Sequence, residues 1–382
     1  MIIVNTKEFS TIVRTASKLI KHPKLSLDAF SQLAVVVKNK NLYIVSLGLS
    51  VPNSQITTAY LVKENVDLED EVYFFKDKDL EKVFSTLGSE TSLTFEQNHL
   101  TVYSNHNGLV TNVNVIRQRP KTPEVEALIL SKMEHIISSM TSVDSGIDSS
   151  TLVKKLNNLL KFKSLDSDSI TFEPNRLSVQ QHSYVAQEPF NFGFTARLSL
   201  DEVTSLIQAL NTVEGGILAY KEDTGLFSYS TATSYFEITQ IKSETYSLDK
   251  FVYTDDNQIE VNRQQLLSAL SLVGNYVNEY SNIYLLLEEE QLIITTTLNK
   301  EQVANLTVPV MKLPVLTRGS NVVNRDYGVN LPTLKTLCSI VEDATVQLYF
   351  EYREFETSLV YLVGEETTNF MLLETYESVG DY

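Results

Sequence analysis

Segments in which apolar residues recur every three or four positions alternate along this chain with segments in which they recur every second position. Apolar residues recur every three or four positions over Thr6–Lys21, which is typical of an amphipathic helix. Asn5 and Glu8 stand three residues apart at its start, the spacing of a capping box. Apolar and polar residues then alternate over Leu33–Val37 and Leu42–Ser46, which is typical of two strands. The start of the chain therefore predicts a helix followed by an antiparallel hairpin.

One hairpin pattern is repeated almost letter for letter. The segment SLTFEQNHLTV at 92–102 returns as SITFEPNRLSV at 169–179, with seven of eleven positions identical. Each copy predicts two strands around a tight polar turn, and each follows a predicted helix. Looser versions elsewhere indicate one helix-plus-hairpin unit used six times, and such repetition is typical of a modular architecture. The six predicted helices span Thr6–Lys21, Lys78–Leu87, Ser150–Phe162, Leu200–Leu210, Arg263–Val277 and Pro332–Val341.

Two polar connectors divide these units into pairs. One is Arg117–Glu124, which contains two prolines, and the other is Glu244–Gln258. Short helices that are each followed by two or more strands indicate an α+β class in which strands dominate. We therefore expect three domains of two units each, over residues 1–119, 120–248 and 249–382. A chain of 382 residues is long enough for two or three cores.

Composition narrows the class of protein. The hydrophobic fraction of 43% is ordinary for a globular protein, and no run of about eighteen apolar residues predicts a membrane span. The first residues lack the charged start and apolar stretch of a signal peptide, and the one cysteine, Cys338, suits a reducing compartment. We expect a cytoplasmic protein with no membrane partner and with Cys338 buried on the apolar side of its helix.

The net charge of −17 argues at first against a nucleic-acid partner, but the charges are unevenly placed. Residues 1–163 hold 19 Lys and Arg against 17 Asp and Glu, whereas residues 164–382 hold 12 against 31. The two balances are +2 and −19, and together they give −17. The basic residues among residues 1–163 concentrate on predicted helices. This distribution favours the interpretation that these helices face a polyanion. A charge pattern that serves solubility alone is the alternative.

No catalytic constellation is visible in the sequence. The five histidines are scattered without metal-ligand spacing, and the chain has no nucleophile elbow, Walker A sequence or dinucleotide fingerprint. Acidic runs such as Glu288–Glu290 fall in predicted turns, where like charges are usually solvated. The sequence therefore favours a non-catalytic protein that uses no cofactor and no metal.

The order of the predicted elements resembles the bacterial-type DNA sliding clamp, the β subunit of DNA polymerase III. The similarity is clearest in the last third, where Val261–Leu270 precedes Asn282–Thr295, and Gly328–Leu337, Val346–Phe350 and Asn369–Leu373 follow. The resemblance spans the whole chain as architecture and is faint residue by residue, which suits a divergent member, such as one encoded by a bacteriophage. It implies three clamp domains per chain and a head-to-tail homodimeric ring with twelve helices around its hole.

The resemblance also implies a function. The chain would be a processivity factor that encircles duplex DNA independently of sequence and tethers the replicative DNA polymerase, after a clamp loader has placed it there. It would act in the cytoplasm of a bacterial cell or of a phage-infected host. A ring holds DNA by topology, so a modest number of lysines suffices, and tighter phosphate binding would add friction. The duplex-facing candidates are Arg14, Lys18, Lys21, Lys24, Lys78, Lys82, Lys154 and Lys161.

Two further surfaces are implied by the resemblance. One is an apolar groove between the second and third domains that accepts short peptides from the polymerase and the loader. The family's Asp-Gly-His turn is not visible there, and an acidic tail follows the last strand. The other surface is a strand pairing between subunits. The groove candidates are Leu177, Val179, Tyr246, Leu248, Phe370, Met371, Leu372 and Leu373, and the subunit-interface candidates are Leu109, Val113, Tyr276 and Val277.

Two other functions stay open at this point. One is a structural or assembly protein built from repeated α+β units, with no DNA in its hole. The other is an enzyme on a strand-rich scaffold, which would need a pocket with converging polar groups. Behaviour on circular DNA separates the clamp from the first alternative, because a closed ring slides off once the circle is cut.

Overall fold

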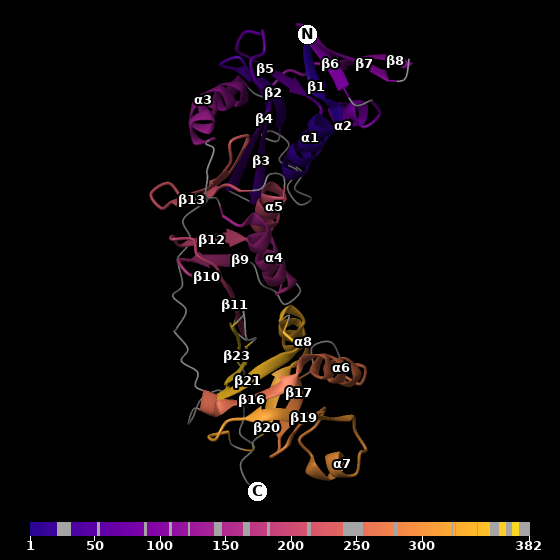
Figure 1. The fold of residues 1–382 in the computed structure, drawn as a ribbon, viewed down its shortest axis with the longest axis vertical. Coiled ribbons are helices and arrows are strands. Elements are labelled where there is room, and N and C mark those ends of the chain that lie inside the picture. The colour runs from indigo at the N-terminus through magenta and orange to yellow at the C-terminus, as the bar shows by residue number, and fades with distance from the viewer. Residues whose placement is uncertain are drawn as a thin grey trace. The chain divides into compact units, whose positions relative to one another are not determined.

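The computed structural model describes most of the chain, which divides into two compact units (Figure 1). The first unit comprises Met1–Val153 and Asp201–Glu244, and the second comprises Lys154–Leu200 and Thr245–Tyr382. The described residues are 1–20, 32–51, 54–87, 90–106, 109–120, 123–140, 147–162, 169–181, 184–211, 215–239, 255–277, 282–322, 324, 326–341, 343–351, 359–363 and 369–373.

The first of three structural repeats runs from β1 to β8 and lies in the first unit. Its strands are ordered β1-β6-β7-β8 in one sheet and β4-β3-β2-β5 in part of a larger one. α1 and α2 pack together, with the ring centroids of Phe9 and Phe84 4.3 Å apart, and apolar residues of both sheets complete this core. The elements are β1 (Ile2–Asn5), α1 (Thr6–Ile20), β2 (Gln32–Lys38), β3 (Asn41–Val51), β4 (Ser54–Lys63), β5 (Glu71–Phe75), α2 (Asp77–Phe84), β6 (Glu90–Phe95), β7 (His99–His106) and β8 (Leu109–Ile116).

The third repeat, from β16 to β23, lies in the second unit and has the same order of elements with one short helix added. β16 precedes α6 and pairs with β21, as β1 precedes α1 and pairs with β6. The elements are the 3₁₀ turn η2 (Asp255–Asn257), β16 (Gln258–Asn262), α6 (Arg263–Gly274), β17 (Asn282–Leu287), β18 (Gln291–Thr295), α7 (Lys300–Ala304), β19 (Val310–Arg318), β20 (Asp326–Asn330), α8 (Leu331–Ile340), β21 (Thr345–Glu351), β22 (Leu359–Val363) and β23 (Asn369–Leu373).

The second repeat, from α4 to β15, contributes strands to both units. β9 to β12 belong to the second unit, and β13 to β15 belong to the first. The described residues directly before α4, Ile147 and Asp148, form no strand, unlike those before α1 and α6. The elements are α4 (Ser149–Leu160), β9 (Ser169–Glu173), β10 (Arg176–Gln181), β11 (Tyr184–Pro189), β12 (Ala196–Ser199), α5 (Leu200–Leu210), β13 (Ile217–Lys221), β14 (Leu226–Ser230) and β15 (Ser234–Thr239).

Antiparallel strand pairing joins neighbouring repeats at two places. In the first seam, β15 of the second repeat pairs with residues 55–60 of β4. In the second seam, residues 370–372 of β23 pair with residues 184–186 of β11. The first seam lies in a seven-stranded sheet ordered β13-β14-β15-β4-β3-β2-β5. The second lies in a twelve-stranded sheet ordered β12-β9-β10-β11-β23-β22-β21-β16-β19-β18-β17-β20.

α3 (Pro123–Ser139) was not predicted from the sequence. It covers one face of the seven-stranded sheet (Figure 1). It buries Val125, Ile129, Met133 and Ile136, whose spacing is helical. The expected connector over 117–124 is therefore wrong at its C-terminal end, where proline occupies a first helical turn that tolerates it. Six helices was also too few, since the described residues form eight α-helices.

The local signals that predicted hairpins and caps are confirmed. Both copies of the repeated segment form hairpins in the same register, with Phe95 opposite Leu100 and Phe172 opposite Leu177. Asn5 Oδ1 accepts a hydrogen bond at 3.0 Å from the amide of the third residue of α1. Short-range sequence patterns therefore predicted these hairpins and this helix cap correctly.

Two expectations about the class of protein can be compared with the fold. Cys338 is fully buried on α8, as expected, and burial raises the pKa of its thiol to about 12. In the described part of the chain, no helix combines the length and the apolar character that a membrane span requires.

Candidate functional site

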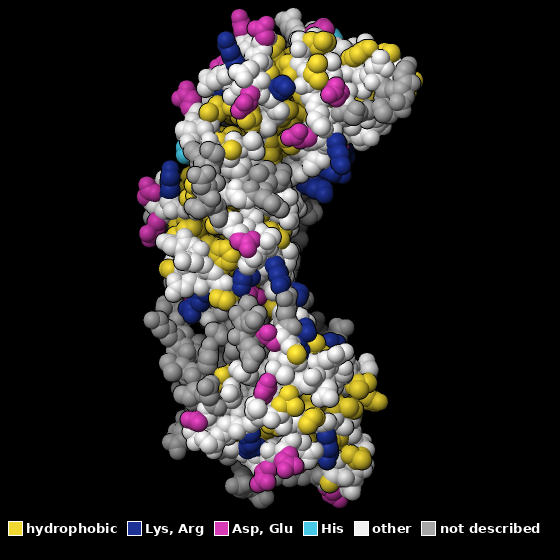
Figure 2. Space-filling model, in the orientation of Figure 1, with side chains coloured by type: hydrophobic (Ala, Val, Ile, Leu, Met, Phe, Trp, Pro, Cys, Tyr) yellow, Lys and Arg dark blue, Asp and Glu magenta, His cyan; other side chains and the backbone are white. Residues whose placement is uncertain are grey.

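The basic residues of α1 and α2 are exposed and lie in one unit. Arg14 and Lys18 extend from α1, and Lys78 and Lys82 extend from α2. The two helices contact each other through their apolar sides, so the four cations belong to adjacent elements. Figure 2 shows basic side chains on this part of the surface. Two other predicted members, Lys21 and Lys24, lie outside the described residues.

The lysines around α4 divide into two kinds. Lys154 and Lys161 are exposed and belong to the second unit. Lys155 is buried, and its Nζ lies 3.2 Å from Oε2 of Glu188 on β11. Oε1 of Glu188 accepts a further hydrogen bond from Asn158 Nδ2 at 3.1 Å. The charge of Lys155 is therefore neutralised inside the unit, whereas Lys154 and Lys161 remain at the surface.

The polar faces of α5 and α6 are mostly uncharged. α6 exposes Gln264 and Ser268. Arg263, at its first position, donates from Nε to the carbonyl oxygen of Cys338 at 3.0 Å and so satisfies the C-terminal end of α8. α8 itself exposes Lys335. The described basic residues of the predicted set therefore fall on α1, on α2, on α4 and, for Lys161, directly after α4.

The predicted peptide groove is described in part. Leu177 and Val179 lie on β10 and are fully buried. Val179, Ala186 and Phe370 form one cross-strand row on β10, β11 and β23, so the C-terminal strand lies one strand away from β10. Met371, Leu372 and Leu373 follow Phe370 in β23, and Tyr246 and Leu248 lie outside the described residues. The groove itself stays a prediction.

β8 is the outermost strand of its sheet, and it exposes large apolar side chains. Leu109 is 71% exposed and Val113 is half-buried. Val110 and Ile116 on the same strand are 57% and 66% exposed and were not among the predicted interface residues. Because a strand edge also presents unpaired backbone groups, this surface suits pairing with another strand. The apolar character of the whole segment, which lacks a charged residue, was the signal that could have identified it.

The second predicted interface patch lies at the end of α6. Tyr276 is 69% exposed and Val277 is half-buried. Leu272, one helical turn earlier, is 49% exposed and was missed. The patch on α6 belongs to the second unit and the β8 edge belongs to the first, so each is described by itself.

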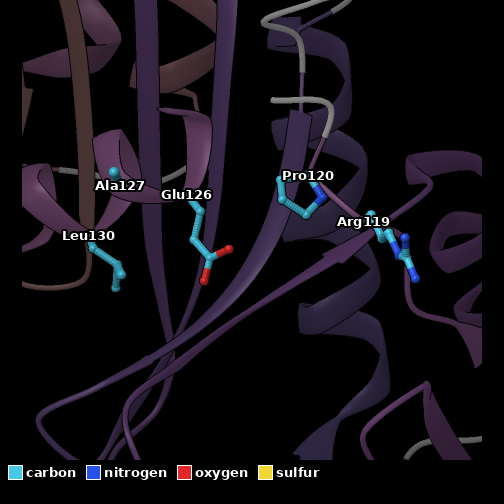
Figure 3. A pocket seen from close by; sticks show the side chains of 5 residues that line it. All are labelled: Arg119, Pro120, Glu126, Ala127 and Leu130. Carbon is cyan, nitrogen blue, oxygen red and sulfur yellow. The ribbon is translucent and has the colours of Figure 1, made fainter. Parts of the chain in front are cut away.

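A shallow hollow of about 460 Å³ lies beside the first turns of α3 (Figure 3). Arg119 and Pro120 line it from the segment before the helix, and Glu126, Ala127 and Leu130 line it from the helix itself. These five residues include no histidine and no nucleophilic side chain. Among the described residues, no three His, Cys, Asp or Glu side chains are grouped to hold a metal ion. The hollow therefore presents no catalytic constellation.

Comparison with known proteins finds similarity in structure. No family model and no curated protein matches the sequence. A DNA polymerase sliding clamp from Pseudomonas aeruginosa matches with a TM-score of 0.71 at 12% identity, over 98% of this chain and 99% of that chain. The DNA polymerase III β subunit of Thermotoga maritima matches with a TM-score of 0.67 at 14% identity, over 97% of this chain and 98% of that chain. The Helicobacter pylori β clamp, solved with a DNA ligase peptide, matches with a TM-score of 0.65 at 12% identity, over 98% of this chain and 99% of that chain.

These matches cover nearly the full length of both partners in each comparison. The chain has the fold of the bacterial DNA polymerase III β sliding clamps, and the expected α+β architecture is confirmed. The low identity agrees with the faint residue-level resemblance seen in the sequence.

Proposed function

We propose that this chain, which has the fold of the bacterial sliding clamps, is itself a DNA sliding clamp. Two copies would close into a ring around duplex DNA and hold the replicative polymerase to it. The observation that carries the proposal is the common rule of the two seams. In each, the strand after the first hairpin of one repeat (β4 or β11) pairs with the last strand of the next repeat (β15 or β23).

The same rule leaves one strand near each end of the chain for a second copy. β19 takes the place of β4 and β11 in the third repeat, and its residues 310–314 pair with β18 alone among the described strands. β8, the last strand of the first repeat, is the outermost of its sheet. Pairing of β8 with β19 of another copy would be head-to-tail, and such contacts generate rings when the rotation closes. The interface would include Leu109 and Val113 on one side and Tyr276 and Val277 on the other.

The three repeats support the proposed division into domains. Residue 119 lies between β8 and α3, and residue 248 lies between β15 and β16. Domains over 1–119, 120–248 and 249–382 would each contain one repeat, and two chains would place six around the hole.

The exposed cations of α1, α2 and α4 support contact with the DNA backbone. Phosphate contacts give affinity without sequence specificity, which suits a protein that must slide. A modest number of contacts limits friction, and the acidic remainder of the chain disfavours DNA elsewhere on the surface. The electrostatic part of the binding should therefore weaken as the salt concentration rises, whereas a ring that is closed around circular DNA should be retained.

The proposal includes partners that bind near β10 and β23. A DNA polymerase and a clamp loader would insert short peptides there, and the Helicobacter pylori β clamp offers a parallel, since its structure holds a DNA ligase peptide. Leucine and aromatic anchors would supply most of the binding energy. The role requires no catalytic group, cofactor or metal, and it places the protein in the cytoplasm of a bacterium or of an infected host.

The net charge of −17 keeps one alternative in view, a ring-shaped assembly protein with no DNA in its hole. Sedimentation combined with electron microscopy tests the shared part of both functions. We expect a particle of twice 43.1 kDa with a hole wide enough for a duplex. A monomer at micromolar concentration, or a dimer without an opening, would rule out both functions. If the ring is found, retention on circular DNA separates the clamp from the assembly protein.

A further inference from the structure

α3 lies across the first seam, on the sheet face opposite α1. Residues alternate along β2 between two cores, since Val35 packs with α1 whereas Ala34 and Val36 pack with α3. The α3 core also contains Ala59 of β4 and Tyr235 of β15. One helix therefore contacts strands of two repeats, on both sides of the first seam.

An ion pair between half-buried Lys132 and buried Glu237 attaches α3 to the seam itself. Nζ of Lys132 donates to Thr57 Oγ1 at 3.0 Å and to Glu237 Oε1 at 2.5 Å. Thr57 and Glu237 are register partners across the first seam. The Tyr235 hydroxyl donates to the other oxygen of Glu237 at 2.7 Å and lies 3.3 Å from His135 Nε2. Lys132 therefore bridges the first and second repeats at one point.

Burial makes this ion pair sensitive to position. The Glu237 side chain is 4% exposed, and a buried carboxylate that loses its cation is strongly unfavourable. Burial, together with the charge of Glu237, raises the pKa of Tyr235, so the hydroxyl keeps its proton and remains a donor. A shift of α3 would leave the carboxylate without its cation, and separation of β4 from β15 would break the contact of Lys132 with Thr57 or with Glu237. The network thus favours one register of the helix on the sheet.

α3 lies in the chain before α4, the first helix of the second repeat. β1 and β16 directly precede α1 and α6 and pair with β6 and β21. Before α4, the described residues keep one bond of that kind, from the amide of Ile147 to the carbonyl of Gly216 at 2.9 Å. In the described part of the second repeat, the segment before the first helix therefore contains α3, which covers the first seam.

We propose that α3 holds the first seam rigid, so that β13 to β15 move as one body with the first repeat. Flexing that accompanies ring opening then occurs at the second seam, where the described residues form three register pairs, against six in the first seam. The role of α3 at the first seam is independent of DNA, whereas the role in opening rests on the proposed function.

Amide hydrogen exchange of the full chain tests the first part. Lys132→Met should raise exchange of β4 and β15 by at least about tenfold, because the buried Glu237 loses its cation, and should leave β11 and β23 unchanged. Glu134→Gln, at an exposed charge on the same helix, is the matched control and should change neither seam. Lys132→Met combined with Glu237→Gln should restore most of the protection, since no charge is then left buried. Unchanged exchange in Lys132→Met, or an equal rise in both units, would overturn the proposal.

Disulfides placed in each seam test the role in opening. Gln55→Cys with Thr239→Cys would cross-link register partners of the first seam, and Val185→Cys with Met371→Cys would cross-link partners of the second. We expect loading onto circular DNA to stay within about twofold for the first pair and to fall at least about tenfold for the second. Equal loss in both would overturn the assignment of flexing to the second seam. If the unmodified chain is not retained on circles, the proposed function and the opening role fall together, and hydrogen exchange still decides the role of α3.

Discussion

The β8 edge and the basic faces of α1 and α2 belong to the same repeat but differ in every physical property that matters for binding. The edge is apolar and presents open backbone groups, whereas the helix faces are polar with separated cations. In a packed apolar interface, replacing one central side chain can remove most of the binding free energy. When separated cations bind phosphates, removing each cation lowers the affinity for DNA by a small step. Closure of the ring and retention of DNA should therefore be separable by mutation.

Charge on the β8 edge should produce the largest effect. Leu109→Asp with Val110→Asp places two carboxylates on an apolar strand edge, where unpaired charge opposes strand addition. We expect the dimer dissociation constant to rise at least about a hundredfold, as measured by sedimentation equilibrium.

Ile217→Asp is the matched control for that experiment, because Ile217 is a 41% exposed residue on another outermost strand, β13. It should leave dimerisation unchanged. Equal weakening by both variants would mean that the β8 edge has no special role in closure.

Removal of Lys155 should produce the next largest effect, on stability instead of DNA binding. Lys155→Met leaves Glu188 buried without its cation, and we expect a loss of about 3 kcal/mol in the free energy of unfolding, measured by urea denaturation. Lys154→Met, at the neighbouring exposed position, should change stability by less than about 0.5 kcal/mol. Similar losses in the two variants would contradict the distinction between buried and exposed lysines.

Neutral substitutions on α1 should weaken DNA retention in smaller steps. Arg14→Gln with Lys18→Gln should lower affinity several-fold at physiological salt, and should reduce the salt slope of binding by about 0.9 for each phosphate that is no longer neutralised. The dimer should persist. Lys63→Gln, at an exposed lysine on a strand, is the control. If it reduces the slope as much, the helix faces are not the DNA surface.

The smallest effect concerns the start of α4, which orients Lys154. Hydrogen bonds from the side chain and amide of Thr151 and from Ser150 hold the pKa of Asp148 at about 2. A lowered pKa means that the cap contributes fully above pH 3.8 and is lost as the pH falls through about 2. Amide exchange of Thr151 should rise over that range. Asp148→Asn, which keeps an acceptor, should abolish this pH dependence, and its persistence would assign it to another group.

The sequence predicted best what depends on neighbouring residues. The register of the repeated hairpin follows from alternation around a short turn, and the cap at Asn5 follows from local spacing. The polar faces of the helices were also predictable, because helical periodicity separates Arg14 and Lys18 from the apolar side.

The parts that were missed depend on contacts between distant segments. α3 was hidden because two prolines suggested a connector, although its apolar spacing was helical. The burial of Lys155 depends on Glu188 in a strand that the helix packs against, and no local pattern shows that pairing. The ion pair of Lys132 joins residues from three elements across the first seam, so it could be found only from the fold.

Retention on circular DNA tests the central claim most directly. The chain is placed on a nicked plasmid by a clamp loader, or by separating the dimer and letting it close again on the DNA. It is then moved to a salt concentration that removes simple electrostatic binding, and the amount retained is compared before and after the plasmid is cut once. The account predicts that the protein stays on the circle at high salt and leaves when the DNA becomes linear, with the Leu109→Asp, Val110→Asp variant lost from both. Equal retention on circular and linear DNA, or equal loss from both by the unmodified chain, would contradict a protein that holds DNA by encircling it.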